Sequence, residues 1–185
     1  MRKLIKENIN GRKIFLLFIL TNIIYVFMLA ITIPKVMSYS GGMKLLDMMP
    51  TGYNIDYVNS LLNALGDNGR NAYLFNQLPV DMIYPFFFAV TYCLILAYFL
   101  NKLGKLESYL FYLCLLPLFS GLFDYCENIG IISLLNTYPD NSNILGQITN
   151  IFSLLKSFST TLYFVTLTGT LIVLGWSTLV PKNNK

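Results

Sequence analysis

The chain has 185 residues, of which 55% are hydrophobic and only 12% are charged. Because soluble domains carry about 25% charged residues, this composition excludes an ordinary soluble protein and indicates a membrane protein. The sequence contains no histidine, which excludes serine-histidine-aspartate triads, cysteine-histidine dyads and zinc-protease helices. The net charge of +4 is explained by the membrane topology predicted below, so we expect no nucleic acid as a partner. We expect no cofactor and no metal.

Four apolar runs are long enough to cross about 30 Å of hydrocarbon at ~1.5 Å per residue. We therefore expect an all-α, integral membrane four-helix bundle that occupies residues 1–185 as a single transmembrane domain. The predicted spans are residues 14–33, 79–100, 108–135 and 143–178. The first run follows a basic segment, as the apolar part of a signal peptide would. It is nevertheless longer than the ~7–15 residues of such a part and lacks a small-x-small cleavage site, so we interpret it as a retained transmembrane helix.

Lysine and arginine predict the orientation of the bundle in the cell membrane. They gather before the first span, in the loop at residues 101–107 and at the C-terminus. The two connections on the opposite side carry fewer basic residues, and aspartates balance these. The positive-inside rule therefore places the N and C termini in the cytoplasm.

Residues 35–78 form the only long segment outside the predicted spans. Asn54 is a good N-cap for a helix that Gly66 ends. Its apolar face consists of Ile55, Val58, Leu62 and Leu65. Residues 67–69 are typical of a turn, and residues 70–78 then form a second short helix. We expect a short amphipathic helical hairpin on the outer side, between the first and second spans, that acts as a packing lid.

Charged side chains inside the apolar runs are the most informative feature. Asp124, Glu127 and Asn128 lie in the third run, and Lys156 lies in the fourth. A charge at the bilayer centre costs about 2.5–3.5 kcal/mol on insertion scales, so such residues are usually paired or functional. Counted from the connecting loop at ~1.5 Å per residue, Asp124 and Lys156 reach nearly the same depth. Because the two helices are antiparallel neighbours, we expect an ion pair between these residues.

Each predicted span keeps its polar side chains on one face, and the four faces have only the bundle interior in common. The faces are Thr21, Tyr25 and Thr32; Asp81, Tyr84 and Thr91; Ser120, Asp124, Glu127 and Asn128; and Thr149, Ser153, Lys156 and Thr160. We therefore expect a small interior cavity with polar and aromatic walls. Asp81, Tyr84 and Arg70 are expected to form its outer rim.

Two short patterns carry a family resemblance. The stretch from Tyr53 to Tyr84, with Asn-Ala-Leu-Gly-x3-Arg and Leu-Pro-Val-Asp-x2-Tyr, resembles an uncharacterised family of small bacterial four-helix integral membrane proteins. The Pro-x6-Asp-x2-Glu-Asn pattern that ends at Asn128 is similar to that family's third-helix signature, and Lys156 resembles its lone fourth-helix lysine. The resemblance covers most of the chain and implies a fold, but it implies no activity.

Three functions stay open. We expect the cavity to bind a small lipophilic or amine-bearing molecule, with Asp124 and Glu127 as its anchor, Asn128 as an orienting amide and Lys156 as the counter-ion. Two close carboxylates do not both ionise easily, so one of them keeps a proton, and the pair would also suit an enzyme acting on a lipid or isoprenoid. Alternatively, the ion pair is purely structural in a subunit of a membrane complex. Membrane lipids are expected partners, and a membrane protein or a second copy of the chain remains an alternative.

Overall fold

The computed structural model describes residues 2–179, and every regular element within that range is a helix. Four of its helices are long and apolar enough to cross a membrane. They are Gly11–Met37, Ile55–Lys102, Tyr109–Thr137 and Asn143–Leu179. Each covers nearly all of one predicted span, so the all-α architecture with four long apolar helices is confirmed.

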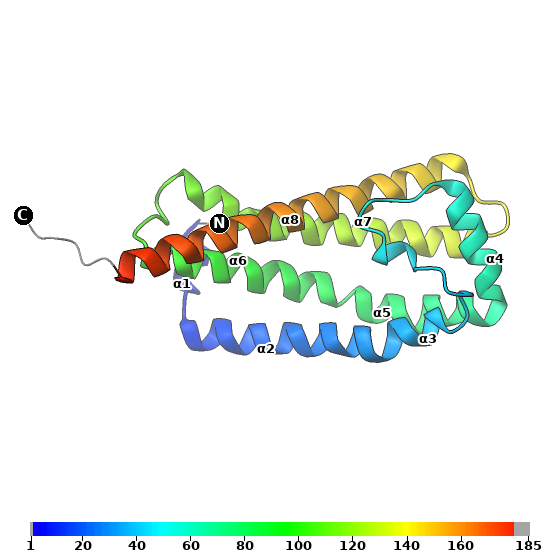
Figure 1. The fold of residues 1–185 in the computed structure, drawn as a ribbon, viewed down its shortest axis with the longest axis horizontal. Helices are drawn as coiled ribbons and strands as arrows, with labels where there is room; N and C mark the ends of the chain where they lie inside the picture. Colours follow the sequence, from blue (N-terminus) through cyan, green and yellow to red (C-terminus); the bar gives the residue numbers. More distant parts are fainter. Residues whose placement is uncertain (1, 180–185) are drawn as a thin grey trace, which may run out of the picture.

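The long helices run side by side along the molecule (Figure 1). Their main parts are α2 (Gly11–Phe27), α6 (Tyr84–Lys102), α7 (Leu116–Thr137) and α8 (Asn143–Leu179). Helix α2 packs mainly against α6, α6 packs against α7, and α7 shares its longest interface with α8. Helices α2 and α8 therefore form the two edges of the bundle. At one end the short α1 (Arg2–Glu7) lies beside α6, and at the other α4 (Ile55–Ala72) crosses the bundle (Figure 1).

Two wide helical turns lie before prolines. They are the π-helical segments η1 (Met28–Thr32), which leads into α3 (Ile33–Met37), and η3 (Tyr73–Gln77), which leads into α5 (Leu78–Asp81). Because Pro34 and Pro79 lack an N–H and their rings crowd the preceding turn, the regular α pattern cannot pass through them unchanged. The two segments contact each other, and the Thr32 hydroxyl donates a hydrogen bond to the Gln77 side-chain oxygen. This contact joins the first and second long helices at the level of the polar interior.

Helix α4 begins as predicted and then departs from the prediction. The Asn54 side chain accepts a hydrogen bond from the Tyr57 N–H at 2.9 Å, which caps the helix. The inner face is fully buried and consists of Val58, Leu61, Leu62 and Leu65. At Gly66 the backbone has φ 56° and ψ −174°, a conformation open essentially to glycine alone, and the helix changes direction there. The predicted turn at residues 67–69 and the separate helix at 70–78 are wrong, because the helix resumes directly after Gly66 and continues toward the second span.

The connection between α3 and α4, residues 38–54, turns back into the end of the bundle; we call it the re-entrant loop. It includes the short 3₁₀ turn η2 (Leu46–Met48). Leu45 and Leu46 are fully buried and belong to the same apolar core as Ile131 and Leu134 of α7. Protein therefore surrounds this non-helical backbone, which is the condition under which such backbone is tolerated even within a membrane protein. The loop thus becomes a wall of the interior.

Small residues set the spacing of the third helix, which begins with the 3₁₀ segment η4 (Tyr109–Leu115) before Pro117. A Cβ atom at Gly121 would lie 2.9 Å from the Pro85 carbonyl oxygen, and one at Gly130 would overlap the side chain of Thr149. Helices α6 and α8 therefore approach the backbone of α7 closely at these two positions. The close approach brings the polar faces of all three helices together.

Candidate functional site

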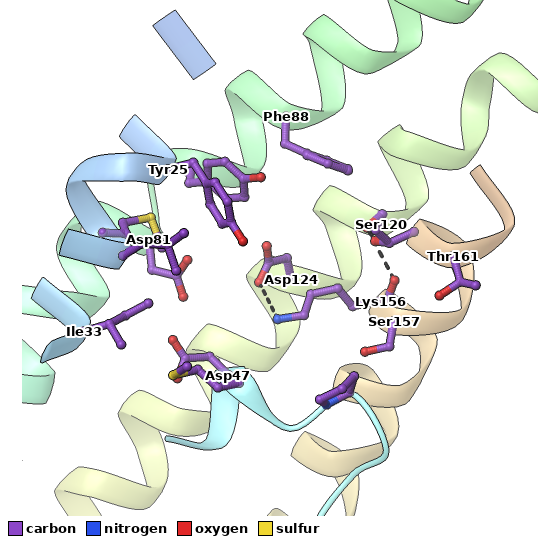
Figure 2. A pocket seen from close by; sticks show the side chains of 16 residues that line it. Tyr25, Ile33, Asp47, Asp81, Phe88, Ser120, Asp124, Lys156, Ser157 and Thr161 are labelled. Carbon is purple, nitrogen blue, oxygen red and sulfur yellow. Dashed lines mark hydrogen bonds and ion pairs between the residues drawn. The ribbon is translucent and has the colours of Figure 1, made fainter. Parts of the chain in front are cut away.

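The bundle interior holds a cavity of about 440 Å³. Its wall includes side chains from every long helix and from the re-entrant loop (Figure 2). Those that bear on its chemistry are Tyr25, Asp47, Asp81, Tyr84, Asp124 and Lys156. The predicted interior cavity with polar and aromatic walls is therefore present.

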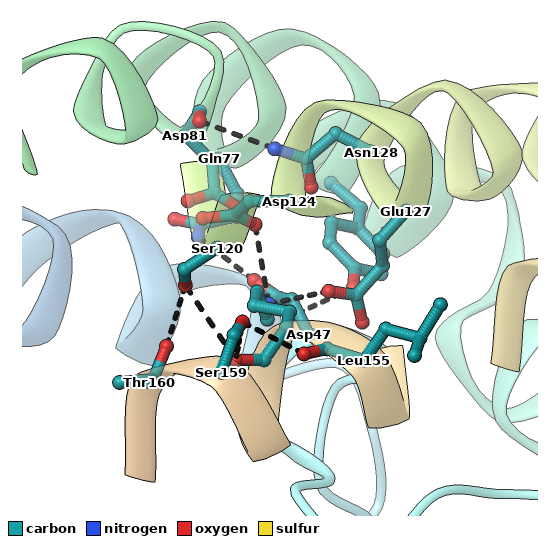
Figure 3. A network of polar contacts seen from close by, with 12 residues as sticks. Asp47, Gln77, Asp81, Ser120, Asp124, Glu127, Asn128, Leu155, Ser159 and Thr160 are labelled. Atoms are coloured by element: carbon teal, nitrogen blue, oxygen red, sulfur yellow. Dashed lines mark hydrogen bonds and ion pairs between the residues drawn. The ribbon is translucent and has the colours of Figure 1, made fainter. Parts of the chain in front are cut away.

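The acid–lysine cluster consists of Asp124, Glu127 and Lys156. Lys156 Nζ lies 3.2 Å from Asp124 Oδ1 and also pairs with Glu127 Oε2 (Figure 3). The predicted ion pair between Asp124 and Lys156 is confirmed, and Glu127 shares the same ammonium group. Residues three apart lie on one face of a helix, which explains why α7 presents both acids to α8. The Glu127 side chain is fully buried, so its charge depends on Lys156 for compensation.

Asn128 ties two helices together beside this cluster. Its side-chain Nδ2 donates a hydrogen bond of 3.1 Å to the backbone carbonyl oxygen of Asp81, at the end of α5. This contact positions the backbone of the second long helix against α7. The expected role of Asn128 in orienting a ligand stays a prediction.

The three residues expected at the outer rim lie in different places. Asp81 is only 4% exposed and lines the cavity instead of its rim. Its carboxylate forms no hydrogen bond or ion pair with any residue in the range 2–179. Tyr84 also lines the cavity, where its ring stacks on Tyr25 with centroids 5.5 Å apart.

Arg70 lies away from the cavity, and its prediction as a rim residue is wrong. Its guanidinium donates a hydrogen bond of 2.7 Å to the Leu62 carbonyl oxygen and pairs with Asp67. It also lies over the Tyr138 ring, 4.5 Å from the centroid. The break at Gly66 leaves carbonyl groups unpaired at the end of the preceding helical segment, and Arg70 caps one of them.

Asp47 is a member of the site that we did not predict. It comes from the re-entrant loop, where it accepts hydrogen bonds from the Tyr73 hydroxyl at 2.6 Å and from Gln77 Nε2 at 3.1 Å. The available signal was an acid within the short apolar stretch from Leu45 to Met49. That stretch is too short to show a helical period, so the sequence alone gave no reason to fold it inward.

Carboxyl groups outnumber ammonium groups at this site by four to one. The carboxyl groups are those of Asp47, Asp81, Asp124 and Glu127, and the ammonium group is that of Lys156. Aromatic rings form the adjoining wall, since Phe88 lies 5.8 Å from Tyr84, centroid to centroid. The negative face of such rings attracts cations. The site therefore combines a surplus of carboxyl groups with aromatic surface.

Behind the acid–lysine cluster, several buried polar atoms have no hydrogen-bond partner among residues 2–179. They are the Tyr53 hydroxyl, Glu127 Oε1 and Asn128 Oδ1. Burial raises the pKa of Tyr53 well above its usual range, and the charge of Glu127 raises it further. The Tyr53 phenol therefore stays neutral and keeps a proton that it can donate.

Comparison of the chain with models of protein families, with curated proteins and with solved structures gives no match. The resemblance to the bacterial four-helix family stays a prediction. The function must therefore be inferred from the chemistry of the site itself.

Proposed function

We propose that the protein is an integral membrane protein whose interior cavity binds a small amine-bearing organic cation. Insertion in a membrane accounts for the large apolar side chains that α2 and α8 leave exposed, such as Ile23, Phe158 and Trp176, each at least 60% exposed. Water would not favour so much contiguous apolar surface, whereas lipid would.

The observation that carries the proposal is the surplus of carboxyl groups on the cavity wall. Asp47, Asp81 and Asp124 line the cavity, and among residues 2–179 Lys156 is the only basic residue that does. The Lys156 ammonium is already engaged by Asp124 and by the buried Glu127. A bound cation would allow the remaining carboxyl groups to ionise, because a buried carboxylate is costly without a partner.

The aromatic wall favours an organic cation over a metal ion. Ca²⁺ and Mg²⁺ take about six or more oxygen ligands, and the rings of Tyr25, Tyr84 and Phe88 supply none from their faces. An alkylammonium group, in contrast, is attracted to aromatic faces and to carboxylates together. The composition of the wall thus matches an amine.

A purely structural role would account for the acid–lysine cluster but not for Asp81. Lys156 together with Asp124 and Glu127 can fix the register of α7 and α8 without further charges. The carboxylate of Asp81 contributes no contact to that arrangement among residues 2–179. Its position on the cavity wall supports a role in binding.

Asp81→Asn tests the proposal, with Asp140→Asn as a control acid on an exposed loop. The probe is benzylammonium, titrated against purified protein in lipid nanodiscs. We expect Asp81→Asn to weaken binding at least tenfold while the protein keeps its helical content and unfolding midpoint. Asp140→Asn should bind like the unchanged protein. Equal binding by Asp81→Asn, or no binding by the unchanged protein, would refute the proposal.

We further propose that both termini face the cytoplasm, because the basic residues gather at that end. In a background without the native cysteines, Lys44→Cys should react with a membrane-impermeant maleimide on intact cells, and Lys105→Cys should not. The reverse pattern of labelling would overturn this orientation.

A further inference from the structure

We infer that the cavity opens sideways into the lipid between α2 and α8, and that its ligand is a cationic amphiphile. The ammonium head would enter through this opening while the apolar tail stays among the lipid chains. The inference rests on the proposed binding of a cation. It adds the route of entry and the chemical class of the ligand.

Toward the α4 end, the re-entrant loop fills the space beside α8. The Tyr53 N–H donates a hydrogen bond of 2.8 Å to the Asn150 side-chain oxygen of α8. The neighbouring Gly52 is so close that a Cβ atom there would lie 2.5 Å from the same oxygen and 3.1 Å from Leu154. Met48 and Pro50 of this loop also line the cavity. The loop therefore separates the cavity from the α4 end of the bundle.

Toward the opposite end, aromatic rings bridge the two edge helices. Phe18 of α2 contacts Tyr92 of α6 edge-on, with centroids 6.3 Å apart, and Tyr92 contacts Phe164 of α8 at 5.6 Å. The hydroxyl of Tyr163 donates a hydrogen bond of 2.8 Å to the Tyr92 carbonyl oxygen, which holds α8 against α6 at this level. This aromatic layer closes the cavity at the end away from α4.

Between these two closures lies the side opening, which we define by Tyr25, Leu29, Ser157 and Thr161. All four residues line the cavity, the first two from the first long helix and the last two from α8. Tyr25 and Leu29 are 42% and 44% exposed, so they belong to the cavity wall and to the outer surface at once. In Figure 2, Thr161 lies on α8 past Lys156, and Tyr25 lies on the other side of the cavity.

The side opening lies at the depth of the lipid chains. Leu29 precedes the end of its helix at Met37 by eight residues, which corresponds to about 12 Å along the helix axis. The hydrocarbon core of a bilayer is about 30 Å thick. A molecule that leaves the cavity through the side opening therefore meets acyl chains, and a ligand that uses this route needs an apolar portion.

The charges at the inner wall define the head group of the ligand. Asp81 and Asp124 favour a positive group, and two acids already balance the charge of Lys156, which leaves it little attraction for a phosphate. The head group is therefore a simple ammonium and not a zwitterionic phosphocholine. An alkylammonium or alkyltrimethylammonium compound with one tail has this chemistry.

The test compares three probes on the full chain in lipid nanodiscs, after subtraction of binding to empty nanodiscs. Tetramethylammonium has the head alone, decyltrimethylammonium has head and tail, and dodecylphosphocholine has a tail with a zwitterionic head. We expect affinity to rise by about fourfold for each tail methylene that leaves water. Decyltrimethylammonium should thus bind much more tightly than tetramethylammonium, and dodecylphosphocholine should bind at least tenfold more weakly than decyltrimethylammonium.

Thr161→Trp tests the route, because a large side chain there would narrow the side opening. Ile172→Trp is the matched control, since position 172 lies three turns further along the same face of α8 and is 65% exposed. We expect Thr161→Trp to slow association of decyltrimethylammonium at least tenfold and Ile172→Trp to leave it unchanged. Circular dichroism verifies that both variants are folded.

Two results would separate the inference from the function on which it rests. If both trimethylammonium probes bind alike and Thr161→Trp has no effect, the cavity binds cations from water and the lateral route is wrong. Equal binding of dodecylphosphocholine and decyltrimethylammonium would overturn the assigned head group. If neither cation binds to the folded protein, the proposed function fails together with the inference.

Discussion

Lys156→Met should be the most damaging single change to the stability of this protein. The substitution keeps the length and apolar body of the side chain and removes only its charged end. Lys156 Nζ pairs with Asp124 and with Glu127, whose side chain is fully buried. Without the ammonium group, both carboxyl groups lose their compensating charge in a region shielded from water.

Removal of one partner from a buried ion pair costs about 3–5 kcal/mol, chiefly because the remaining charge is left without compensation. We expect Lys156→Met to fall in this range. Glu127→Gln should cost less, since it leaves Lys156 paired with Asp124 at 3.2 Å. The triple variant with Asp124→Asn, Glu127→Gln and Lys156→Met should recover most of the loss, because it contains no uncompensated charge at the cluster.

The measurement is equilibrium unfolding in mixed micelles, followed by circular dichroism, for the three variants and the unchanged protein. The order of stability is the decisive result. If Lys156→Met costs less than about 1 kcal/mol, or if the triple variant is less stable than Lys156→Met, the cluster does not compensate charge as described. Such a result would also remove the reason for regarding the remaining acids as a surplus.

Three further changes test how the bundle is assembled, each by the same unfolding measurement. Gly121→Ala should destabilise the protein by about 1–3 kcal/mol, because the added Cβ would lie 2.9 Å from a backbone oxygen that cannot move freely. Its control is Gly169→Ala, where the added Cβ has no neighbour within 4 Å; this change should stabilise the protein by up to ~1 kcal/mol. Gly66→Ala should cost about 1–3 kcal/mol, since the backbone there has φ 56°, and a neutral result would mean that α4 does not bend at this residue. Thr32→Val should lower the free energy of unfolding by about 1–3 kcal/mol, because it leaves the buried Gln77 oxygen without its donor. If this loss of stability is smaller than the gain from Gly169→Ala, the contact between Thr32 and Gln77 is contradicted.

Local sequence patterns determined the main elements of this protein. Long apolar runs have few alternatives to helices, because every backbone group must be paired where water is absent, and this predicted the four long helices. Helical periodicity placed Asp124, Glu127 and Lys156 on facing sides, and a count of residues along two connected helices put them at one depth. The N-cap at Asn54 and the break at Gly66 were equally local, since each depends on the conformation of one residue.

Only the tertiary structure decided which of the other polar residues share the cavity. Asp47 enters it because the re-entrant loop is held by Leu45 and Leu46 against α7, a contact between segments far apart in the chain that has no periodic signature. Arg70 lies outside the cavity because the bend at Gly66 places a free carbonyl group within reach of its guanidinium. The sequence alone therefore determined where the acids and the lysine of α7 and α8 lie, because the helical repeat sets their positions. The surplus of carboxyl groups and the opening between α2 and α8 depend on how segments distant in the chain pack against each other. No local sequence pattern predicts that packing.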